Sequence, residues 1–314
     1  MKRIFKSKKS AVIGIVSLLL VLIVLINVFS SIFLSLAIFE KDGWKKFEEY
    51  LYGGELKNDS EWLSGNCEEI QVENADGKTL NALRVENEHV SHSYIIICHQ
   101  YGGGPETVTE YAKHFYDLGF NIILPYMRGH GASPYNNTTL GWNDGKDILD
   151  WAESISEEDP KARIALFGVS LGANAVTLAA SEEMPENVRL VIADSCYTSL
   201  EGLIKEYIKN ETEFLSIVAT KIVSSYAEKK MGDVFGNGDT IAQLENVDRP
   251  IMFINGENDT VVPSLMSKKL YENCEAYGVE EVIVENGTHG RNLEASKETY
   301  WISVDAFILN NIGI

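Results

Sequence analysis

The chain has 314 residues, of which 45% are hydrophobic and 23% charged, so it is long enough for one large domain or two smaller ones with a sizeable core. Acidic residues outnumber basic ones by 46 to 27, and the formal net charge is −19. A protein of this charge repels phosphates, so we expect no nucleic-acid partner.

The cysteines and histidines form no metal-binding motif. The four cysteines show neither CxxC nor another metal-ligand spacing, and no HExxH or paired His/carboxylate pattern occurs. We therefore expect no metal and no other cofactor. The sequence leaves open whether two of the cysteines form a disulfide, but the spacing indicates no disulfide framework.

The N-terminal part divides into a basic tail and a long apolar run. Residues 1–10 hold five basic residues and no acidic one, and residues 11–39 carry no charge. The run is longer than the roughly 20 residues that span a bilayer, so it predicts one tilted transmembrane helix. The positive-inside rule then places residues 1–10 in the cytoplasm and the body outside, as a single-pass protein of the cell membrane.

Two alternatives for this run stay open. The first alternative to the anchor is a cleavable secretory signal with a small-residue site at Ser35-Leu36-Ala37. The second is a buried helix of a soluble protein. The length of the run favours the anchor over the signal, whose apolar region has typically about 7–15 residues. Residues 40–66, which mix aromatic and charged side chains, predict an amphipathic connector that lies at the membrane interface or packs on the domain.

From residue 67 to the end, apolar strands alternate with helices. Continuous apolar strands separated by helices indicate an α/β fold, with a mostly parallel sheet covered by helices on both faces. The first two strands form a hairpin across Ala75-Asp76-Gly77. The predicted strands are 69–73, 79–85, 94–98, 120–124, 163–167, 190–193, 250–255 and 281–284, and the main helices are 107–118, 141–155, 264–277 and 298–310.

Residues 199–245 separate two strands by far more than one crossover needs. They contain two helical patterns, 200–209 and 214–230, and a glycine-rich stretch, 232–238. Insertions of this kind lie above the sheet, where open α/β folds bind ligands, so we interpret this one as a helical cap over the site. Its apolar residues either line an acyl pocket or pack the cap on the core: Leu203, Ile204, Tyr207, Ile208, Phe214, Leu215, Ile217 and Val218.

The strongest motif lies between the strand at 163–167 and an alanine-rich helical pattern. It reads Gly168-Val169-Ser170-Leu171-Gly172, which is Gly-x-Ser-x-Gly. A strand, this turn and a helix are the context of a nucleophile elbow, which raises the serine Oγ above the sheet. An ordinary turn with a surface serine can have the same Gly-x-Ser-x-Gly sequence. The assignment of Ser170 as a nucleophile therefore depends on finding a base and an orienting group for it.

A serine nucleophile needs a base, and the base needs an orienting group. Of the six histidines, His289 follows a strand in a glycine-flanked loop, and Asp259 follows the strand before it. The order Ser170, Asp259, His289 is that of the α/β-hydrolases. We therefore predict that Ser170 attacks, His289 carries the proton and Asp259 orients the imidazole.

The developing oxyanion needs backbone N–H donors. One predicted donor is Leu171, directly after the nucleophile. The other lies in the loop 99–105, where we favour Tyr101 over Gln100. We expect His99 and the glycines of this loop to be structural, and the absence of a following Gly-Lys-Ser/Thr disfavours a phosphate loop.

With these motifs, the chain resembles an α/β-hydrolase of the serine-aminopeptidase-like group, and is similar to bacterial membrane-anchored esterases. In this family the Arg-Gly-His-Gly segment is a structural turn, so the resemblance implies no catalytic role for Arg128 or His130. The chain departs from the family at Gln100, where glycine is usual, and at Tyr126, where aspartate is frequent. The matching segments are 99–102, 128–133, 168–172, 194–195, 259–263 and 287–290.

The resemblance and the motifs together predict a serine hydrolase that cleaves small-molecule carboxylic esters or thioesters, with lipids among the candidates. One alternative is a serine peptidase that releases N-terminal residues, another a membrane-tethered binding protein without catalysis. The sequence leaves the acyl length and the oligomeric state open. For the peptidase, candidates to bind a free amine are Glu201, Glu206, Glu211 and Glu213.

Overall fold

The computed structural model describes residues 2–37, 41, 51–211, 220–221, 225 and 239–312. Most of the predicted cap helix 214–230, the glycine-rich stretch 232–238 and residues 42–50 of the connector lie outside the described residues. The four cysteines are all described, and each is a free thiol.

An eight-stranded sheet organises the body, in the order β1-β2-β4-β3-β5-β6-β7-β8. β2 pairs antiparallel with β1 and β4, and the other neighbours pair parallel, so the sheet is mixed but mostly parallel. All eight predicted strands occur, within two residues of their predicted bounds. The strands are β1 Glu68–Glu73, β2 Thr79–Val85, β3 Ser93–Cys98, β4 Asn121–Pro125, β5 Arg163–Val169, β6 Val188–Asp194, β7 Ile251–Gly256 and β8 Glu280–Val284.

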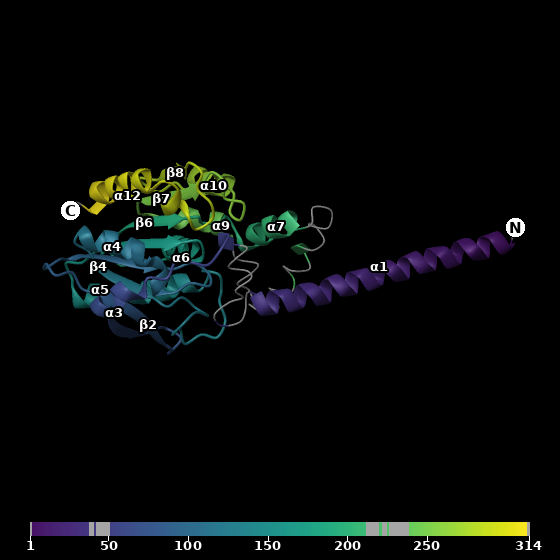
Figure 1. The fold of residues 1–314 in the computed structure, drawn as a ribbon, viewed down its shortest axis with the longest axis horizontal. Coiled ribbons are helices and arrows are strands. Elements are labelled where there is room, and N and C mark those ends of the chain that lie inside the picture. Colours follow the sequence, from purple (N-terminus) through teal and green to yellow (C-terminus); the bar gives the residue numbers. More distant parts are fainter. Residues whose placement is uncertain are drawn as a thin grey trace.

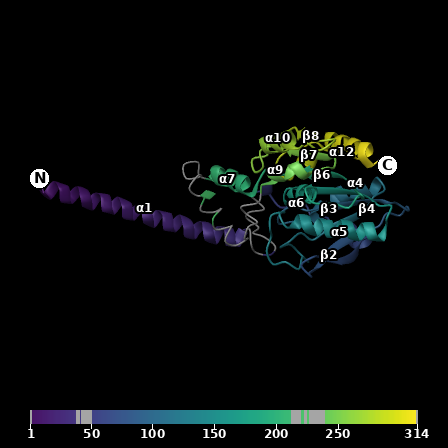
Figure 2. The same cartoon turned by 180° about the vertical axis from the view of Figure 1, so that it is seen from behind.

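Helices cover both faces of this sheet, as Figures 1 and 2 show from opposite sides. The helices of the body are α3 Ser60–Asn66, α4 Thr109–Asp117, α5 Asp144–Glu158, α6 Leu171–Ala179, α7 Leu200–Glu211, α9 Thr240–Gln243, α10 Ser264–Asn273, α11 Asn292–Ala295 and α12 Lys297–Ile312, with 3-10 turns η1 Pro105–Val108 and η4 Leu244–Asn246. The predicted α/β fold class is confirmed.

Alternate residues of the central strands feed two separate hydrophobic cores. In β3, Ile96 and Cys98 pack with α5, α6 and α10, whereas Ile95 and Ile97 pack with α4 and α12. Every residue of β3 is buried. A strand buried on both faces reads as a continuous apolar run, which is why these strands could be recognised in the sequence.

One predicted helix begins later than expected. The pattern 141–155 predicts a helix from residue 141, but α5 begins at Asp144. Leu140 and Gly141 have positive φ values of 49° and 86°, which a right-handed helix does not allow. The Asp144 side chain accepts hydrogen bonds from the Gly141 N–H (3.1 Å) and the Thr139 hydroxyl (2.8 Å), which hold this turn in place.

A single long helix, α1 Lys2–Ala37, precedes the body and projects away from it (Figure 1). Its stretch Lys9–Asn27 has a mean hydropathy of 2.8 and is not buried by the protein. By length and composition, α1 is therefore able to cross a membrane. After the connector, Leu51 and Tyr52 are both buried, and α3 then packs Leu63 into the core.

The turn between β5 and α6 is closely packed against β3. A Cβ built on Gly168 would lie 2.2 Å from the carbonyl of Gly172, and one on Gly172 would lie 2.2 Å from the Cys98 carbonyl oxygen. Backbone atoms cannot move aside as a flexible side chain can, so both positions exclude any larger residue. The two glycines therefore allow the strand, the turn and the helix to meet.

β6 ends in a buried carboxylate, Asp194, which ties the sheet to the C-terminal helices. Its Oδ1 accepts hydrogen bonds from Asn292 Nδ2 (2.6 Å) and Ser195 Oγ (2.9 Å), and its Oδ2 accepts one from the Tyr300 hydroxyl (2.8 Å). Burial raises the pKa of Asp194 to about 6, although these donors favour the charged form.

Gly172→Ala tests the close packing at the β5–α6 turn. We expect a loss of about 2 kcal/mol or more in the free energy of unfolding, because overpacking against backbone has no cheap relaxation. The midpoint of thermal unfolding of the full chain in detergent measures the loss. The matched control is Gly65→Ala, on an exposed helical position with no atom within 4 Å of the added Cβ, which should leave the midpoint unchanged or slightly raised. Equal midpoints for wild type and Gly172→Ala would contradict this account of the turn.

Asp194→Asn tests the buried carboxylate through its pH dependence. Because the folded-state pKa of about 6 lies above the ordinary aspartate value of 3.8, the wild type loses stability as the pH rises from 4 to 7. The asparagine variant has no such charge to bury. The stability advantage of the wild type over Asp194→Asn should therefore shrink between pH 4 and pH 7, by up to about 3 kcal/mol. Unfolding midpoints of both proteins across this range measure the difference, and a constant difference would show that Asp194 does not titrate there.

Candidate active site

Ser170 stands at the junction of β5 and α6 in a strained backbone conformation, with φ 53° and ψ −108°. Its N–H donates to the Asp194 carbonyl at 2.8 Å, which links the turn to the end of β6. A non-glycine residue with positive φ persists only where its surroundings impose it, and such residues gather at functional sites. The side chain is largely buried, with 6% of the residue exposed.

The structure brings the three residues predicted as a triad into one hydrogen-bonded chain. Ser170 Oγ lies 2.8 Å from His289 Nε2, and His289 Nδ1 lies 2.8 Å from Asp259 Oδ2. Asp259 comes from the loop after β7 and His289 from the loop after β8, so all three meet at the carboxyl edge of the parallel strands. His289 and Asp259 are also buried, which excludes competing water.

The hydrogen bonds of Asp259 settle how the imidazole is oriented. Its Oδ1 accepts from the N–H groups of Val261 (2.9 Å) and Val262 (2.7 Å), so only Oδ2 faces the histidine. A carboxylate can only accept, so His289 Nδ1 carries the proton and Nε2 is left to accept from the Ser170 hydroxyl. This arrangement allows His289 to act as a general base toward Ser170.

In the loop after β3, hydrogen bonds orient two successive peptide groups, Gln100–Tyr101 and Tyr101–Gly102. The Gln100 carbonyl accepts from the Gly103 N–H (3.1 Å) and from His99 Nδ1 (2.8 Å). This carbonyl shares a planar peptide with the Tyr101 N–H, so the same bonds orient the predicted oxyanion donor. The next amide, Gly102 N–H, donates to His130 Nε2 at 3.0 Å. The second predicted donor, Leu171, is the first residue of α6, where helix N–H groups have no partner within the helix. The oxyanion roles of Tyr101, Leu171 and Gln100 stay predictions.

Two buried histidines support this loop in their neutral form. His99 Nε2 accepts from the Met127 N–H at 3.2 Å, and burial together with the neighbouring His130 lowers the pKa of His99 to about 3. His130 donates from Nδ1 to the Arg128 carbonyl at 3.0 Å while its Nε2 accepts from Gly102. Each ring therefore joins the loop after β3 to the segment after β4.

Tyr126 stands where the family frequently has an aspartate, and here Arg128 pairs with the carboxylate of Asp147. The Arg128 guanidinium makes two hydrogen bonds of 2.7 Å with Asp147 of α5, and it lies over the ring of Tyr135 with 4.0 Å to the centroid. Tyr126 instead lies beside Gly131, where a Cβ would be 2.6 Å from the Tyr126 ring. A carboxylate on α5 thus neutralises the buried arginine.

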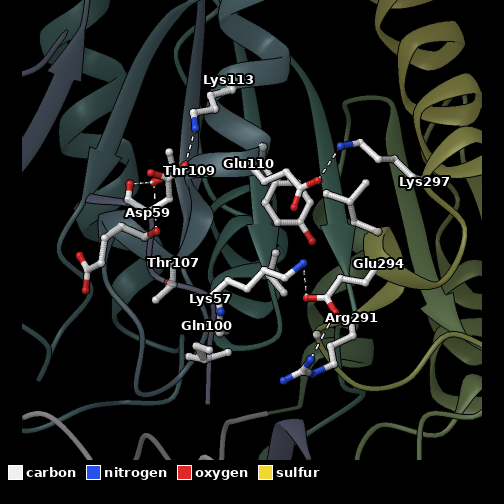
Figure 3. Close-up of a pocket in the computed structure, with 16 residues that line it drawn as sticks. Lys57, Asp59, Gln100, Thr107, Thr109, Glu110, Lys113, Arg291, Glu294 and Lys297 are labelled. Atoms are coloured by element: carbon white, nitrogen blue, oxygen red, sulfur yellow. Dashed lines mark hydrogen bonds and ion pairs between the residues drawn. The ribbon is translucent and has the colours of Figure 1, made fainter. Parts of the chain in front are cut away.

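The departure at Gln100 places an amide next to a cavity of about 340 Å³. Gln100 is 4% exposed, and none of the described residues donates to its Oε1. Val169 and Gly290, the neighbours of Ser170 and His289 in the sequence, also line this cavity. Most charged side chains of the lining are paired with one another (Figure 3), in ion pairs between Lys57 and Glu294, Lys113 and Asp59, and Lys297 and Glu110.

Of the predicted cap 199–245, the structure describes α7 at its start, α9 and the beginning of η4 at its end, and three residues between them. Ile204 belongs to the hydrophobic core and Leu203 packs against it, so these two residues pack the cap on the body. The remaining predicted pocket residues have side chains outside the described part, as do Glu211 and Glu213. Within the described ranges, no cluster of three or more His, Cys, Asp or Glu side chains is arranged to hold a metal ion.

Several residues that shape the site were missed in the sequence. Asn292 and Tyr300 hold Asp194 behind the Ser170 turn, and Tyr52 lies directly against His289. Each contact joins segments far apart in the chain, and no local pattern marks them. Of these supporting residues, Asp147 could have been found from the sequence, because it is a carboxylate on the apolar face of the predicted helix 141–155.

Two family models match overlapping parts of the chain. A model of the α/β hydrolase fold matches residues 94–208, and a model described as serine hydrolase (FSH1) matches residues 155–290. Together they run from β3 to the loop that carries His289.

Curated relatives are distant in sequence. The uncharacterized protein YqkD of Bacillus subtilis is 25% identical over 225 residues, which are 71% of this chain and 73% of that protein. The lysophosphatidylserine lipase ABHD12 of Macaca fascicularis is 26% identical over 191 residues, 58% of this chain and 45% of that protein. Four further relatives are matched over 59% to 65% of their own lengths.

A solved structure shares the fold. The Pyrococcus furiosus esterase Pf2001 superposes with a TM-score of 0.66 at 19% sequence identity, covering 81% of this chain and 95% of that one. The family models, the strand order and the elbow between β5 and α6 agree with one another. The chain therefore has the α/β-hydrolase fold, and the two family models support its place in the α/β-hydrolase superfamily.

Proposed function

We propose that this protein is a serine hydrolase that cleaves carboxylic esters or thioesters through an acyl-enzyme on Ser170. The observation that carries the proposal is the buried hydrogen-bonded chain from Ser170 through His289 to Asp259, with 2.8 Å at each link. The match to a serine hydrolase family model supports it, as do a relative named as a lysophosphatidylserine lipase and a structural neighbour named as an esterase.

In this mechanism, His289 Nε2 takes the hydroxyl proton as Ser170 Oγ attacks the carbonyl carbon of the substrate. The negative charge that develops on the carbonyl oxygen is stabilised by the N–H groups of Leu171 and Tyr101. Asp259 stabilises the imidazolium, which then gives its proton to the leaving alcohol or thiol. Water, activated by the same histidine, releases the acid and restores Ser170.

We also propose that α1 anchors the protein in a membrane with the hydrolase body on the extracytoplasmic side. The apolar stretch Lys9–Asn27 and the basic residues before it support this orientation. Both views place α7 at the end of the body from which α1 projects (Figures 1 and 2). An anchored body with this orientation would meet amphiphilic esters at the membrane surface, so we favour acyl substrates of medium or greater length.

A fluorophosphonate probe tests the nucleophile on the full chain in detergent. The wild type should be labelled at Ser170, and Ser170→Ala should not be labelled at all. His289→Ala should label at least about 10³-fold more slowly, because the hydroxyl loses its base. Ser303→Ala, a serine on α12 that hydrogen-bonds its own helix, is the matched control and should label as the wild type does. Absence of label on a folded wild type would refute the proposal.

Substrate class is tested with p-nitrophenyl esters of increasing acyl length beside aminoacyl p-nitroanilides. We expect turnover of the esters, abolished in Ser170→Ala, and little turnover of the anilides. Preferential cleavage of the anilides would instead establish the peptidase alternative. Labelling of Ser170 without turnover of either series would favour a narrower acyl substrate, to be sought among lipid esters.

A further inference from the structure

Tyr52, in the connector between the apolar helix and the first strand, places its aromatic ring against the imidazole of the active site. Tyr52 and His289 stack with 5.6 Å between ring centroids and 10° between ring planes. Tyr52 is 3% exposed, so the ring is packed inside the site. It reaches the site from outside the 94–290 region that the family models match.

The hydroxyl of the same side chain contacts the predicted oxyanion loop. It donates to the Tyr101 carbonyl at 3.1 Å. That carbonyl belongs to the peptide whose N–H, on Gly102, donates to His130. Tyr52 and His130 therefore hold the two ends of one peptide unit, and Tyr52 contacts both the base and the loop.

The loop that carries His289 in turn holds Tyr52. Arg291 donates from Nε to the Tyr52 carbonyl at 2.6 Å and from Nη2 to the Glu55 carbonyl at 3.2 Å. Gly290, with φ +63°, lies so close that a Cβ there would be 3.0 Å from the Tyr52 ring. The stack is thus fixed on both sides, by backbone bonds and by close packing at a glycine.

We propose that Tyr52 is a positioning residue of this active site, which holds the His289 imidazole toward Ser170. The inference rests on the proposed function. The base lies in a loop, and the flat face of Tyr52 limits rotation of its ring. The π face also favours the imidazolium that forms when His289 takes the proton. The active site is therefore completed by the segment next to the apolar helix, not by the 67–314 region alone.

An occluding role for Tyr52 predicts the opposite result. A ring that only blocks access would slow the reaction, so its removal would expose Ser170 and accelerate labelling. A positioning ring has to be present for Ser170 to be activated, so its removal slows labelling. The sign of the change therefore separates the two roles.

The test compares Tyr52→Leu, Tyr52→Phe and wild type as full chains in detergent, by the second-order rate of Ser170 labelling with a small fluorophosphonate. We expect Tyr52→Leu to react at least 10-fold more slowly and Tyr52→Phe, which keeps the stack, to stay within about 3-fold of wild type. With a short-chain ester, the loss in Tyr52→Leu should fall mainly on kcat. The matched control is Tyr277→Leu, whose side chain is 85% exposed and should leave the rate unchanged.

Arg291→Met provides a second route that leaves the ring itself intact. It removes the two hydrogen bonds from Arg291 to the carbonyls of Tyr52 and Glu55 and should slow labelling by several-fold. The double variant with Tyr52→Leu should be no slower than Tyr52→Leu alone, because both substitutions act through the same ring stack. Labelling of Tyr52→Leu at the wild-type rate or faster would overturn the inference while leaving the proposed function in place. If Tyr52→Leu fails to fold, an unchanged rate in Arg291→Met overturns it. A folded wild type that does not label would instead overturn the proposed function.

Discussion

The site depends on the close approach of three backbones at the carboxyl edge of β3 and β5. Gly168 and Gly172 let the strand, the turn and the start of α6 meet where any Cβ would overlap a backbone atom. Only in that packing is Ser170 held at positive φ, with its N–H bonded to the end of β6. The cost of this conformation is met by the two hydrophobic cores on either face of the sheet. A rigid sheet can therefore present a strained serine to groups that arrive on loops.

The polar groups around this turn are buried but extensively hydrogen-bonded. Asp194 accepts from three side chains, and His99 and His130 each bond on both ring nitrogens. Buried polar groups in a medium of low dielectric constant are costly when unpaired and rigid when paired, so these bonds define one arrangement of the loops. Gln100 and Asn292 are exceptions, because Gln100 Oε1 and Asn292 Oδ1 are buried and accept no hydrogen bond from the described residues. Gln100 lies beside the cavity between the connector and α4 and precedes Tyr101 in the chain.

The region before the hydrolase body is part of the same architecture. The stack of Tyr52 on His289 and the hydrogen bond from Arg291 to the Tyr52 carbonyl connect the segment that follows the apolar helix to the loop that carries His289. Asp59 is likewise bonded to η1 and to the start of α4, because its N–H donates to the Glu106 carbonyl and its carbonyl accepts from the Thr109 hydroxyl. A chain cut at the first strand would lose these contacts, so the boundary of the compact unit lies before the boundary of the sheet.

The sequence by itself determined the α/β fold, the eight strands and the order of the three polar residues. Buried parallel strands are continuous apolar runs, and the elbow is a local pattern of strand, turn and helix, so both are readable without knowing what they contact. The helix predicted from residue 141 was wrong at its start, because positive φ values at Leu140 and Gly141 follow from packing on α6. Only the tertiary structure decided that Ser170, His289 and Asp259 lie within 2.8 Å of their neighbours, and that Tyr52, Asn292 and Arg291 support the site. Those contacts join residues up to 239 positions apart, and no local propensity encodes a contact over such a separation.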